Sequence, residues 1–472
     1  NRFDFDRAPM HEPWFDFYQY GGIVRDVFLH VLPRQSLPWI TGVYVTPELI
    51  SSDSGAGSEG WVNVDISIRC NHASRPELTD LGIEIDGTLL DFIPVREKSL
   101  QDEASDTIRI QARLKVPHAR VWSPETPHLH TLRVILSHRN APMDDFGARF
   151  GLRTIEARDG ALWLNGQRLV LKGFNRHEWH PGSGPCTSPL QMLADLQHLR
   201  AMGCNFIRGA HYPQDQRFLD LCDSLGFLVW EENLGWGQRE KTFASTLWQQ
   251  HHAATLEAMV RTSFNHPSVI IWGFLNEAGT NQRYTRDTIE ACAALLRRLD
   301  PSRPITYASM FGLTDLHFDL VDIISLNTYP GWYGCEQVAE PLETIEPAIK
   351  ELVEHLDASG HSAKPVLISE IGAEALYGWR DTHHDFFTEE YQAEYLRRAC
   401  HAALGNPRCS GIALWHFSDI RTYSGGRSLL RPRTFNNKGV MDEYRRPKVA
   451  YGVVRQAFAE LGTPSHATSC GK

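Results

Sequence analysis

The chain has 472 residues and a formal net charge of −10, and 42% of its residues are hydrophobic. A chain of this length exceeds one ordinary hydrophobic core, so roughly two or three domains are expected. The negative charge argues against a nucleic-acid partner. No apolar run is long enough to span a bilayer, which argues against a membrane association through the chain itself.

The cysteine pattern and the first residues bear on the compartment. The nine cysteines show no framework spacing, so reduced thiols are expected. The chain opens with Asn1 and shows no signal-peptide pattern. These observations leave the location open and favour the cytoplasm, and a homo-oligomer is compatible with the composition.

Residues 1–36 are rich in aromatic side chains, and a Gly-Gly turn leads into the alternating run IVRDVFLHV, which is expected to be a strand. Two strands cannot bury a core of their own. We therefore interpret residues 1–36 as the C-terminal strands of a truncated β domain whose beginning precedes the sequence given.

Residues 37–150 contain short alternating stretches separated by clusters of Ser, Gly, Pro and Asp. Regular short strands over such a length predict an immunoglobulin-like β-sandwich. This region carries no functional motif and is given the role of a spacer. The expected strands include ITGVYVTPEL, WVNVDISIRC, LGIEIDGTLL, TIRIQARLKV and HTLRVILSHR.

Residues 151–472 change period, because from Leu169 onward strand-like runs alternate with amphipathic helical segments. Eight such pairs predict a (β/α)8 TIM barrel. An open doubly wound sheet is the alternative, but GFNRHEWHPGSG lacks the glycine spacing of its phosphate loop. The expected strands are LVLKGFNRHE, CNFIRGAHYP, FLVWEENLGWG, SVIIWGFLNE, PITYASM, DIISLNTYPG, PVLISEIGA and SGIALWHFSD.

Polar and aromatic side chains follow almost every expected barrel strand. Chemistry in such barrels lies at the C-terminal ends of the strands, so these side chains are expected on one rim. Glu231, Glu232 and Asn233 follow the third strand and are given no separate role. The other rim residues are Arg176, His177, Glu178, Arg208, His211, Trp236, Asn276, Glu277, Asn327, Tyr329, Glu370, Trp415 and Asp419.

Two of these side chains, Glu277 and Glu370, are carboxylates at the ends of β-rich runs. Retaining cleavage of a glycosidic bond needs an acid/base and a nucleophile roughly 5–5.5 Å apart. We assign Glu277 as the acid/base and Glu370 as the nucleophile. Asn276 is expected to donate to the sugar 2-hydroxyl, and Arg208 to keep the nucleophile ionised. The alternative is a structural ion pair for Arg208 and for Glu178, and a solvated strand end for either glutamate.

The segments GFNRHEWHP, NFIRGAHYP, WGFLNEAG, LNTYPGWYG, ISEIGA and ALWHFSD together resemble glycoside hydrolase family 2. That family contains β-galactosidases, β-mannosidases and β-glucuronidases built from a jelly-roll, an immunoglobulin-like and a barrel domain. The resemblance implies the same acid/base and nucleophile, and it implies that residues 1–36 end a jelly roll. It further implies that Asp16, His211 and Trp415 line the sugar subsite, with Trp236 in support.

The segment after the last strand, TFNNKGVMDEYRRPK, bears on the substrate. It resembles the N-x-K-G motif of the β-glucuronidases, in which the Asn and Lys bind the uronic-acid carboxylate, here Asn436 and Lys438. A carboxylate on the sugar needs a cation, which a neutral CH2OH group does not. Arg433 or Arg431 would add a second positive group. The alternative is that Lys438 is a solvated loop lysine.

The resemblance favours a β-glucuronidase, because LNTYPGWYG is similar to the glucuronidase version of that strand end and supplies Asn327, Tyr329 and Tyr333. RHEWHPGSG is nearer to the β-galactosidase form, so a β-galacturonidase or a β-galactosidase is an alternative. A non-catalytic carbohydrate-binding protein is the rival from another class. The metal ligands of the large β-galactosidases are not recognisable, so no metal and no other cofactor is expected.

Overall fold

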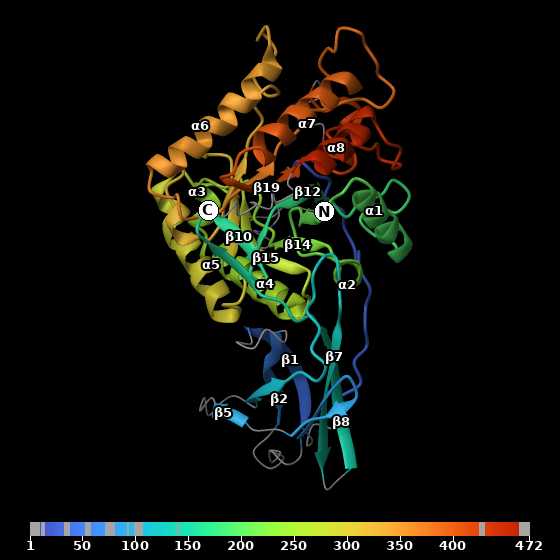
Figure 1. The fold of residues 1–472 in the computed structure, drawn as a ribbon, viewed down its shortest axis with the longest axis vertical. Coiled ribbons are helices and arrows are strands. Elements are labelled where there is room, and N and C mark those ends of the chain that lie inside the picture. The colour runs from blue at the N-terminus through green and yellow to red at the C-terminus, as the bar shows by residue number, and fades with distance from the viewer. Residues whose placement is uncertain are drawn as a thin grey trace, which may run out of the picture.

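The computed structural model describes residues 10, 15–32, 38–51, 58–70, 81–91, 94–98, 107–138, 141–423 and 430–461. A β-sandwich and a larger barrel follow each other along the chain, and Figure 1 shows the sandwich strands below the barrel.

The sandwich consists of two four-stranded antiparallel sheets with the orders β1-β2-β6-β5 and β4-β3-β7-β8. The alternating apolar residues that predicted these strands are the ones that are buried. In β6, for example, every second residue is buried. The buried side chains of both sheets form one core, as the predicted sandwich requires. The strands are β1 (Trp39–Ser51), β2 (Ser58–Arg69), β3 (Leu81–Ile85), β4 (Thr88–Leu89), β5 (Pro94–Lys98), β6 (Thr107–Lys115), β7 (His130–His138) and β8 (Ala141–Phe150).

The larger body is a closed barrel of eight parallel strands in chain order. All eight strands expected from the sequence are present, so the prediction of a (β/α)8 barrel is confirmed and the open sheet is wrong. Their residues are buried almost without exception, as both faces of a parallel barrel strand are covered. The strands are β12 (Leu171–Arg176), β13 (Phe206–Gly209), β14 (Leu228–Glu232), β15 (Val269–Asn276), β16 (Ile305–Ser309), β17 (Ile324–Asn327), β18 (Val366–Glu370) and β19 (Cys409–Leu414).

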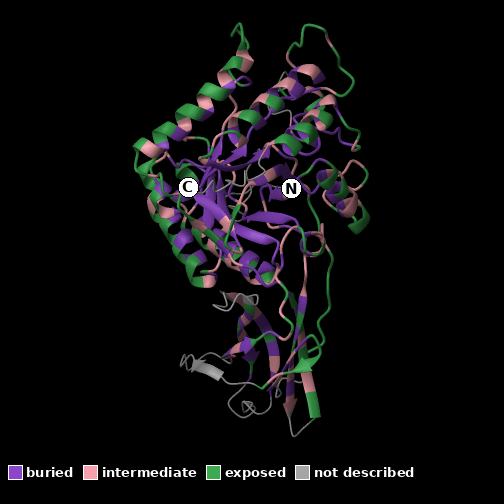
Figure 2. Ribbon diagram, in the orientation of Figure 1, coloured by how far each residue is buried: buried purple, intermediate pink, exposed green. Residues whose placement is uncertain are grey.

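Helices surround the barrel, and Figure 2 shows that they combine buried inner faces with exposed outer faces. Their ends follow local chemistry: Ser188 and Gln191 form a capping box at α1, and Gly226 ends α2 at a φ of 74°. The α-helices are α1 (Pro189–Ala201), α2 (Gln216–Leu225), α3 (Glu240–Phe243), α4 (Thr246–Ser263), α5 (Arg286–Leu299), α6 (Ile345–Ala358), α7 (Glu389–Leu404) and α8 (Val449–Glu460). Short 3-10 turns are η3 (Arg283–Thr285), η4 (Phe318–Leu320), η5 (Pro341–Thr344) and η6 (Pro432–Thr434).

Two small sheets complete the barrel. Strands β9 (Ile155–Arg158), β10 (Ala161–Leu164) and β11 (Gln167–Leu169) form an antiparallel sheet. Its Leu162 shares a buried cluster with Leu171 and Leu228, the first residues of β12 and β14, so this sheet closes the N-terminal end of the barrel. The ladder of β20 (Ile420–Arg421) and β21 (Phe435–Asn436) lies after the last barrel strand.

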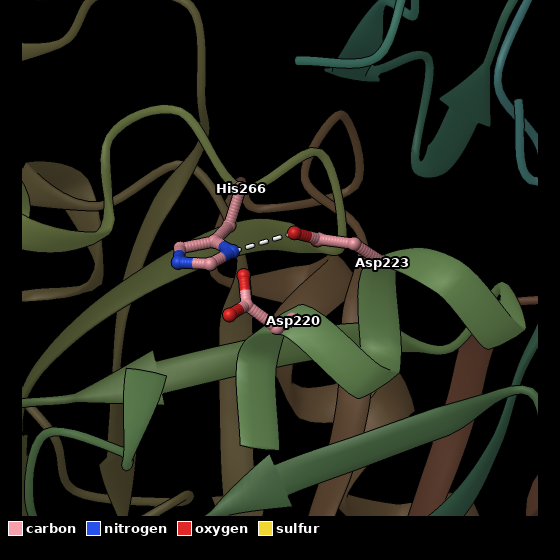
Figure 3. A group of neighbouring side chains, drawn as sticks. All are labelled: Asp220, Asp223 and His266. Carbon is pink, nitrogen blue, oxygen red and sulfur yellow. Dashed lines mark hydrogen bonds and ion pairs between the residues drawn. The ribbon is translucent and has the colours of Figure 1, made fainter. Parts of the chain in front are cut away.

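The junction between the sandwich and the barrel is built from specific polar contacts. The amide of Asn265 bridges the backbone of β1, with a bond of 2.9 Å from Val45 and one of 2.8 Å to Val43. Arg149 of β8 forms an ion pair with Asp220 of α2. Figure 3 shows Asp220 beside Asp223 and His266, and Asp223 also accepts the indole of Trp122 on its backbone carbonyl at 2.9 Å.

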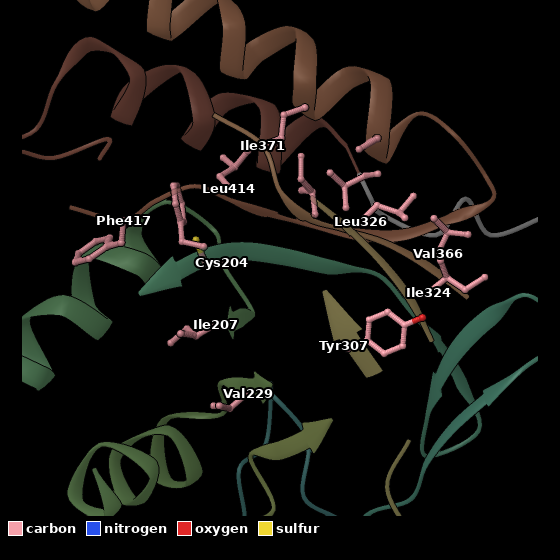
Figure 4. Close-up of a cluster of buried hydrophobic side chains, with 14 of the residues drawn as sticks. Cys204, Ile207, Val229, Tyr307, Ile324, Leu326, Val366, Ile371, Leu414 and Phe417 are labelled. Carbon is pink, nitrogen blue, oxygen red and sulfur yellow. The ribbon is translucent and has the colours of Figure 1, made fainter. Parts of the chain in front are cut away.

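The main hydrophobic core lies between the barrel strands and their helices. Figure 4 shows part of it, with Ile207, Val229, Ile324, Val366 and Leu414 from five barrel strands. Cys204 and Cys222 belong to this cluster, so these two thiols serve as small core residues. The eight cysteines within the described residues are free.

Residues 15–32 form no regular strand, so the prediction of a strand over IVRDVFLHV is wrong. The segment, dark blue in Figure 1, runs along the barrel toward the sandwich. Its side chains Val27, Leu29 and Val31 are 76%, 92% and 90% exposed, because the segment pairs with no strand of the described residues. The assignment of residues 1–36 to a jelly roll stays a prediction, and residues 1–9, 11–14 and 33–36 lie outside the described residues.

Candidate active site

The end of β15 places Asn276 and Glu277 at the C-terminal rim of the barrel. Glu277 has a φ of 49°, in the left-handed region that costs a residue other than glycine about 1–3 kcal/mol. Its backbone N–H donates to the carbonyl of Ala308 in the neighbouring strand at 2.9 Å. Its side chain remains partly exposed. The strained backbone is thus held by the sheet, while part of the residue stays accessible at the rim.

Glu370, the last residue of β18, is 3% exposed and receives two strong hydrogen bonds. Nη1 of Arg208 donates to its Oε1 at 2.7 Å, and the hydroxyl of Tyr329 donates to its Oε2 at 2.7 Å. Arg208 is fully buried above the ring of Trp230, 4.5 Å from the ring centre. Each oxygen of Glu370 therefore has a donor that favours the ionised form.

Two amides join the carboxylates. Nδ2 of Asn327 donates to Oε1 of Glu277 at 3.1 Å and to Oδ1 of Asn276 at 3.0 Å. Oδ1 of Asn276 also accepts from Nη2 of Arg208 at 2.8 Å. The second predicted amide, Asn276, is thus fixed between the arginine that holds Glu370 and the amide that holds Glu277.

The surroundings separate the acidities of the two carboxyl groups. Burial, reinforced by the negative charge of Glu370, raises the pKa of Glu277 to about 7. Burial also raises the pKa of Glu370, but the charge and hydrogen bonds of Arg208 and the bond from Tyr329 oppose it. Glu277 has one neutral amide donor and Glu370 a guanidinium, so Glu277 is the one of the two carboxyl groups that more readily keeps a proton.

Aromatic and imidazole rings line the other side of Glu370. The ring of Trp415 stacks on His211 at a centroid distance of 5.2 Å. Nε2 of His211 lies 3.8 Å from Oε1 of Glu370, and its Nδ1 lies 2.9 Å from Oε1 of Glu232. His211 and Trp415, which the resemblance assigns to the sugar subsite, therefore lie beside the predicted nucleophile.

A second polar cluster contains Lys438, which is fully buried and not a solvated loop residue. Its Nζ donates to the hydroxyl of Tyr333 at 2.8 Å and to Oε1 of Glu374 at 3.1 Å. The ammonium also lies 4.8 Å from the ring centre of Tyr333. Glu374 is fully buried as well.

Arg431 and Asp16 complete this cluster. The guanidinium donates to both oxygens of Asp16, through Nε at 3.0 Å and Nη2 at 2.5 Å, and Nη1 donates to Glu374 at 2.5 Å. Nδ2 of Asn436 donates to Oδ2 of Asp16 at 3.1 Å. Asp16 from the N-terminal segment is therefore bound to the loop that carries Asn436 and Lys438.

The two clusters are in contact through tyrosines. The rings of Tyr329 and Tyr333 meet edge to face with centroids 5.2 Å apart. Tyr329 bonds Glu370 and Tyr333 bonds Lys438, so a short chain of contacts connects the predicted nucleophile with the predicted carboxylate-binding lysine.

Two of the predicted residues, Arg433 and Glu178, lie outside the two clusters, and the backbone of a third, Trp236, pairs with Asn276. Arg433 has 47% of its side chain exposed and pairs with Glu443 at 3.0 Å, so the positive group beside Lys438 is Arg431. Glu178 forms the structural ion pair considered as its alternative, with Arg25 at 2.6 Å. Trp236 packs edge to face on Phe15 with centroids 5.6 Å apart, which supports the N-terminal segment.

Sequence reasoning gave no role to Glu232 or Glu374, although both are fully buried in these clusters. Glu232 lies at the end of a barrel strand, a position that indicates a functional residue. Glu231 beside it lies at the same strand end, so the sequence does not distinguish the two. Glu374 lies four residues after Glu370 in the same rim loop, and the two cations that it binds, Arg431 and Lys438, are distant in the sequence.

A group of potential metal ligands at the sandwich junction, Asp220, Asp223 and His266, brings its ligand atoms within 4.8 Å of one another (Figure 3). Nδ1 of His266 donates to Asp223 at 2.5 Å, and Nε2 faces the amide oxygen of Gln216 at 3.0 Å. Burial lowers the pKa of His266, but the charge and hydrogen bond of Asp223 and the charges of Asp220 and Glu231 together outweigh it, so the pKa is raised. Both ring nitrogens of His266 already have protein partners, so we assign these residues to the junction.

The closed barrel and the paired carboxylates at its C-terminal rim are those of a glycosidase barrel. The sequence matches "Glycosyl hydrolases family 2, TIM barrel domain" over residues 155–462 and "Glycosyl hydrolases family 2" over residues 40–153. The chain therefore belongs to glycosyl hydrolase family 2, as the resemblance indicated.

The chain is similar to uronidases of this family. It is 30% identical over 460 residues to a β-glucuronidase of Chlorocebus aethiops, covering 95% of this chain and 66% of that protein. It thus spans about two thirds of the length of that relative. The structure matches that of a GH2 β-galacturonidase from Eisenbergiella tayi bound to galacturonate, with 33% identity, a TM-score of 0.82, and coverage of 95% and 77% of the two chains.

A third similar protein is the β-glucuronidase from Ruminococcus gnavus in complex with uronic deoxynojirimycin. It has 25% identity and a TM-score of 0.81, and the match covers 95% of this chain and 72% of that one. Among the described residues, no helix of this chain has both the length and the apolar character needed to cross a membrane.

Proposed function

We propose that this chain is the catalytic part of a retaining, exo-acting β-uronidase that hydrolyses terminal β-D-glucuronides. The observation that carries the proposal is the position of Lys438. Its buried ammonium bonds Tyr333, whose ring packs on the Tyr329 that holds Glu370. A sugar with its anomeric carbon at Glu370 then has a cation near its far end.

The first chemical step forms a glycosyl-enzyme. A carboxylate oxygen of Glu370 bonds to the anomeric carbon while the bond from that carbon to the aglycone oxygen breaks, and Glu277 gives its proton to the departing oxygen. The raised pKa of Glu277, about 7, keeps this proton available near neutral pH. Arg208 holds Glu370 in the ionised form that the attack requires.

The second step returns both groups to their initial states. Ionised Glu277 takes a proton from water, the water oxygen bonds to the anomeric carbon, and the bond to Glu370 breaks. Tyr329 donates to the released carboxylate. Retention of configuration follows from two displacements at the same carbon.

The sugar carboxylate is assigned to the cluster around Lys438. Lys438 and Asn436 would bind it directly, and Arg431 would add positive charge beside them. Asp16, held by Arg431 and Asn436, would accept hydrogen bonds from sugar hydroxyls. Asp16 comes from outside the barrel and lies against the loop of Lys438. It would therefore close the site at the end where the sugar carboxylate binds. A site closed at this end fits the removal of a terminal sugar.

A β-galacturonidase is the second candidate, since the Eisenbergiella tayi β-galacturonidase shares 33% identity with this chain. The RHEWHPGSG segment favours the same alternative. Galacturonate differs from glucuronate at C4 alone, so the carboxylate contact would serve both sugars.

The experiment is hydrolysis of p-nitrophenyl β-D-glucuronide and β-D-galacturonide, with the first-formed sugar followed by proton NMR. We expect the β-anomer to appear first, at a higher initial rate with the glucuronide. A first-formed α-anomer would overturn the two-step mechanism, and a faster galacturonide would select the second candidate. Binding of both sugars without turnover would favour the carbohydrate-binding alternative.

A further inference from the structure

Two neighbouring carboxylates at the end of β14, Glu231 and Glu232, are both fully buried but contact different residues. Glu231 accepts the backbone N–H of Gln214 at 2.9 Å. Glu232 has no contact with solvent and bonds Arg208 and His211, the two side chains that flank Glu370. Adjacent strand residues point to opposite faces, which accounts for the difference.

Glu232 determines how Arg208 is oriented. Its Oε2 accepts from Nε of Arg208 at 3.1 Å and from Nη2 at 2.7 Å, which fixes one edge of the guanidinium. The opposite nitrogen, Nη1, donates to Glu370 at 2.7 Å and to Asn175 at 2.9 Å. Nη2 also donates to Asn276 at 2.8 Å. All five N–H groups of Arg208 thus have an acceptor, and a planar guanidinium held at two edges cannot turn away from Glu370.

Glu232 also determines where the proton of His211 resides. Burial and the positive charge of Arg208 lower the pKa of His211 well below its ordinary value, so the ring is neutral and carries one N–H. Oε1 of Glu232 lies 2.9 Å from Nδ1. Burial raises the pKa of Glu232 to about 7, but two N–H groups of Arg208 donate to its Oε2 and favour the ionised form, which can only accept a hydrogen bond. Nη2 of Arg208 also lies 3.3 Å from Nδ1, but its two N–H groups have nearer acceptors in Glu232 and Asn276. The proton of His211 is therefore on Nδ1, and Nε2 is left as an acceptor. Nε2 of His211 lies 3.8 Å from Oε1 of Glu370, so it faces the predicted nucleophile.

We propose that Glu232 is a positioning residue for this site: it holds Arg208 against Glu370 and keeps Nε2 of His211 unprotonated, so that His211 accepts a hydrogen bond from a sugar hydroxyl. This inference rests on the proposed glycosidase function. It assigns one carboxylate two tasks, each carried by a separate oxygen, and neither task requires contact with substrate.

The first test is Glu232→Gln with Glu231→Gln as its matched control. The glutamine at 232 has nearly the same shape and its oxygen can still accept from Arg208, but its amide donates to Nδ1 of His211. The proton of His211 then moves to Nε2, and the acceptor is lost. We expect kcat/KM on the preferred uronide to fall about 10- to 100-fold, the range typical when a residue that orients a reactive group is changed. Glu231→Gln, buried to the same extent in the same strand, should remain within about threefold of wild type.

The second readout is the pH profile, which a merely structural role would not move. Arg208, Glu232, Glu277, His211 and Tyr329 are the charged and titratable groups that face Glu370. Glu232→Gln removes a negative charge near Glu370, so the pKa of Glu370 falls and the acid limb of kcat/KM moves to lower pH. Glu232→Asp retains the charge, so its rate should fall while its acid limb stays at the wild-type pH.

The third readout is independent of turnover. Selective 15N labelling of the histidines, with His211 assigned through His211→Gln, reports its tautomer. We expect a proton on Nδ1 in the wild type and on Nε2 in Glu232→Gln, and this holds even for a protein that hydrolyses no glycoside. Failure of the wild type on every glycoside would count against the proposed function alone.

Two results would overturn the inference about Glu232. One is a Glu232→Gln protein that matches Glu231→Gln in both rate and acid limb. The other is a wild-type His211 with its proton on Nε2. If Glu232→Gln does not fold, as judged by circular dichroism, Glu232→Asp and the wild-type tautomer still decide between these outcomes.

Discussion

The hydroxyl of Tyr329 lies 2.7 Å from Oε2 of Glu370, and the ring of the same tyrosine packs against Tyr333, whose hydroxyl bonds Lys438. Tyr329 thus contacts both the predicted nucleophile and the tyrosine beside Lys438, the residue proposed to bind the sugar carboxylate. A shift of the lysine loop would therefore disturb the nucleophile. This coupling is the structural reason to treat the two clusters as one site.

The roles of the two glutamates differ in a way that kinetics can separate. Glu370→Gln should lower kcat by roughly three orders of magnitude or more on every substrate, because no other group can form the covalent intermediate. Glu277→Gln should impair substrates with poor leaving groups far more than a dinitrophenyl uronide, whose departure needs no proton.

Steady-state rates on three aryl uronides of increasing leaving-group pKa provide the measurement. Near-wild-type turnover in either variant would contradict the assignment, and so would an equal loss across all leaving groups in Glu277→Gln. Unchanged circular dichroism is the control for folding.

The pH dependence follows from the same pair. The general acid must be protonated, so kcat/KM should decline as pH rises through about 7, the raised pKa of Glu277. The nucleophile must be ionised, so the acid limb should reflect Glu370, whose pKa is raised from its ordinary value. The two limbs are apparent values of a coupled pair.

A profile of kcat/KM from acid to alkaline pH provides the test, with Glu277→Gln alongside. The basic limb should disappear in that variant, since no acid remains to lose its proton. A basic limb that persists unchanged in Glu277→Gln would show that another group donates the proton.

Some of this site could be predicted from the sequence because strand ends in a barrel converge whatever the loops do. Glu277 and Glu370 follow apolar runs and meet at one rim, and Lys438 carries a short motif. The choice between Arg431 and Arg433 could not be made in advance. Arg433 and Thr434 have φ values of 63° and 61°, and this left-handed turn directs the two arginines to different partners.

The errors and omissions have physical reasons too. The run IVRDVFLHV alternates like a strand, but alternation forms a strand only where a partner strand supplies hydrogen bonds. The burial of Glu232 and Glu374 depends on cations elsewhere in the sequence, since Glu374 pairs with a lysine at position 438. A sequence-local pattern carries no signal for such a pair.

Removal of divalent metal ions should leave activity intact. The proposed reaction uses carboxyl, guanidinium and phenol groups. The side chains of Asp220, Asp223 and His266, which could act as metal ligands, are already bonded to other residues of the protein. Initial rates before and after dialysis against excess EDTA test this expectation. Complete loss of activity that Mg2+ restores would contradict it.

The junction between the sandwich and the barrel should weaken as pH rises. The folded-state pKa of His266 is raised above its ordinary value of 6.5, since burial is outweighed by the charge and hydrogen bond of Asp223 together with the charges of Asp220 and Glu231. A raised pKa gives a stabilisation that is fully present below the unfolded-state value and is lost as pH rises through the folded-state value. The wild type and His266→Gln should therefore differ in the temperature of the first unfolding transition at pH 6, and this difference should shrink as the pH is raised to 9. Calorimetry that finds a constant or growing difference would contradict a raised pKa of His266.

The most direct test of the account compares initial rates on p-nitrophenyl β-D-glucuronide, β-D-galacturonide and β-D-galactoside for wild type, Lys438→Ala and Lys438→Arg. Loss of a buried charge contact costs about 2 kcal/mol or more, so Lys438→Ala should lower kcat/KM on the uronides roughly 30-fold or more. The galactoside, which has no carboxylate, should be affected much less, and Lys438→Arg should recover part of the uronide rate. A wild type that prefers the galactoside, with Lys438→Ala lowering all three rates equally, would contradict the claim that Lys438 selects a sugar carboxylate.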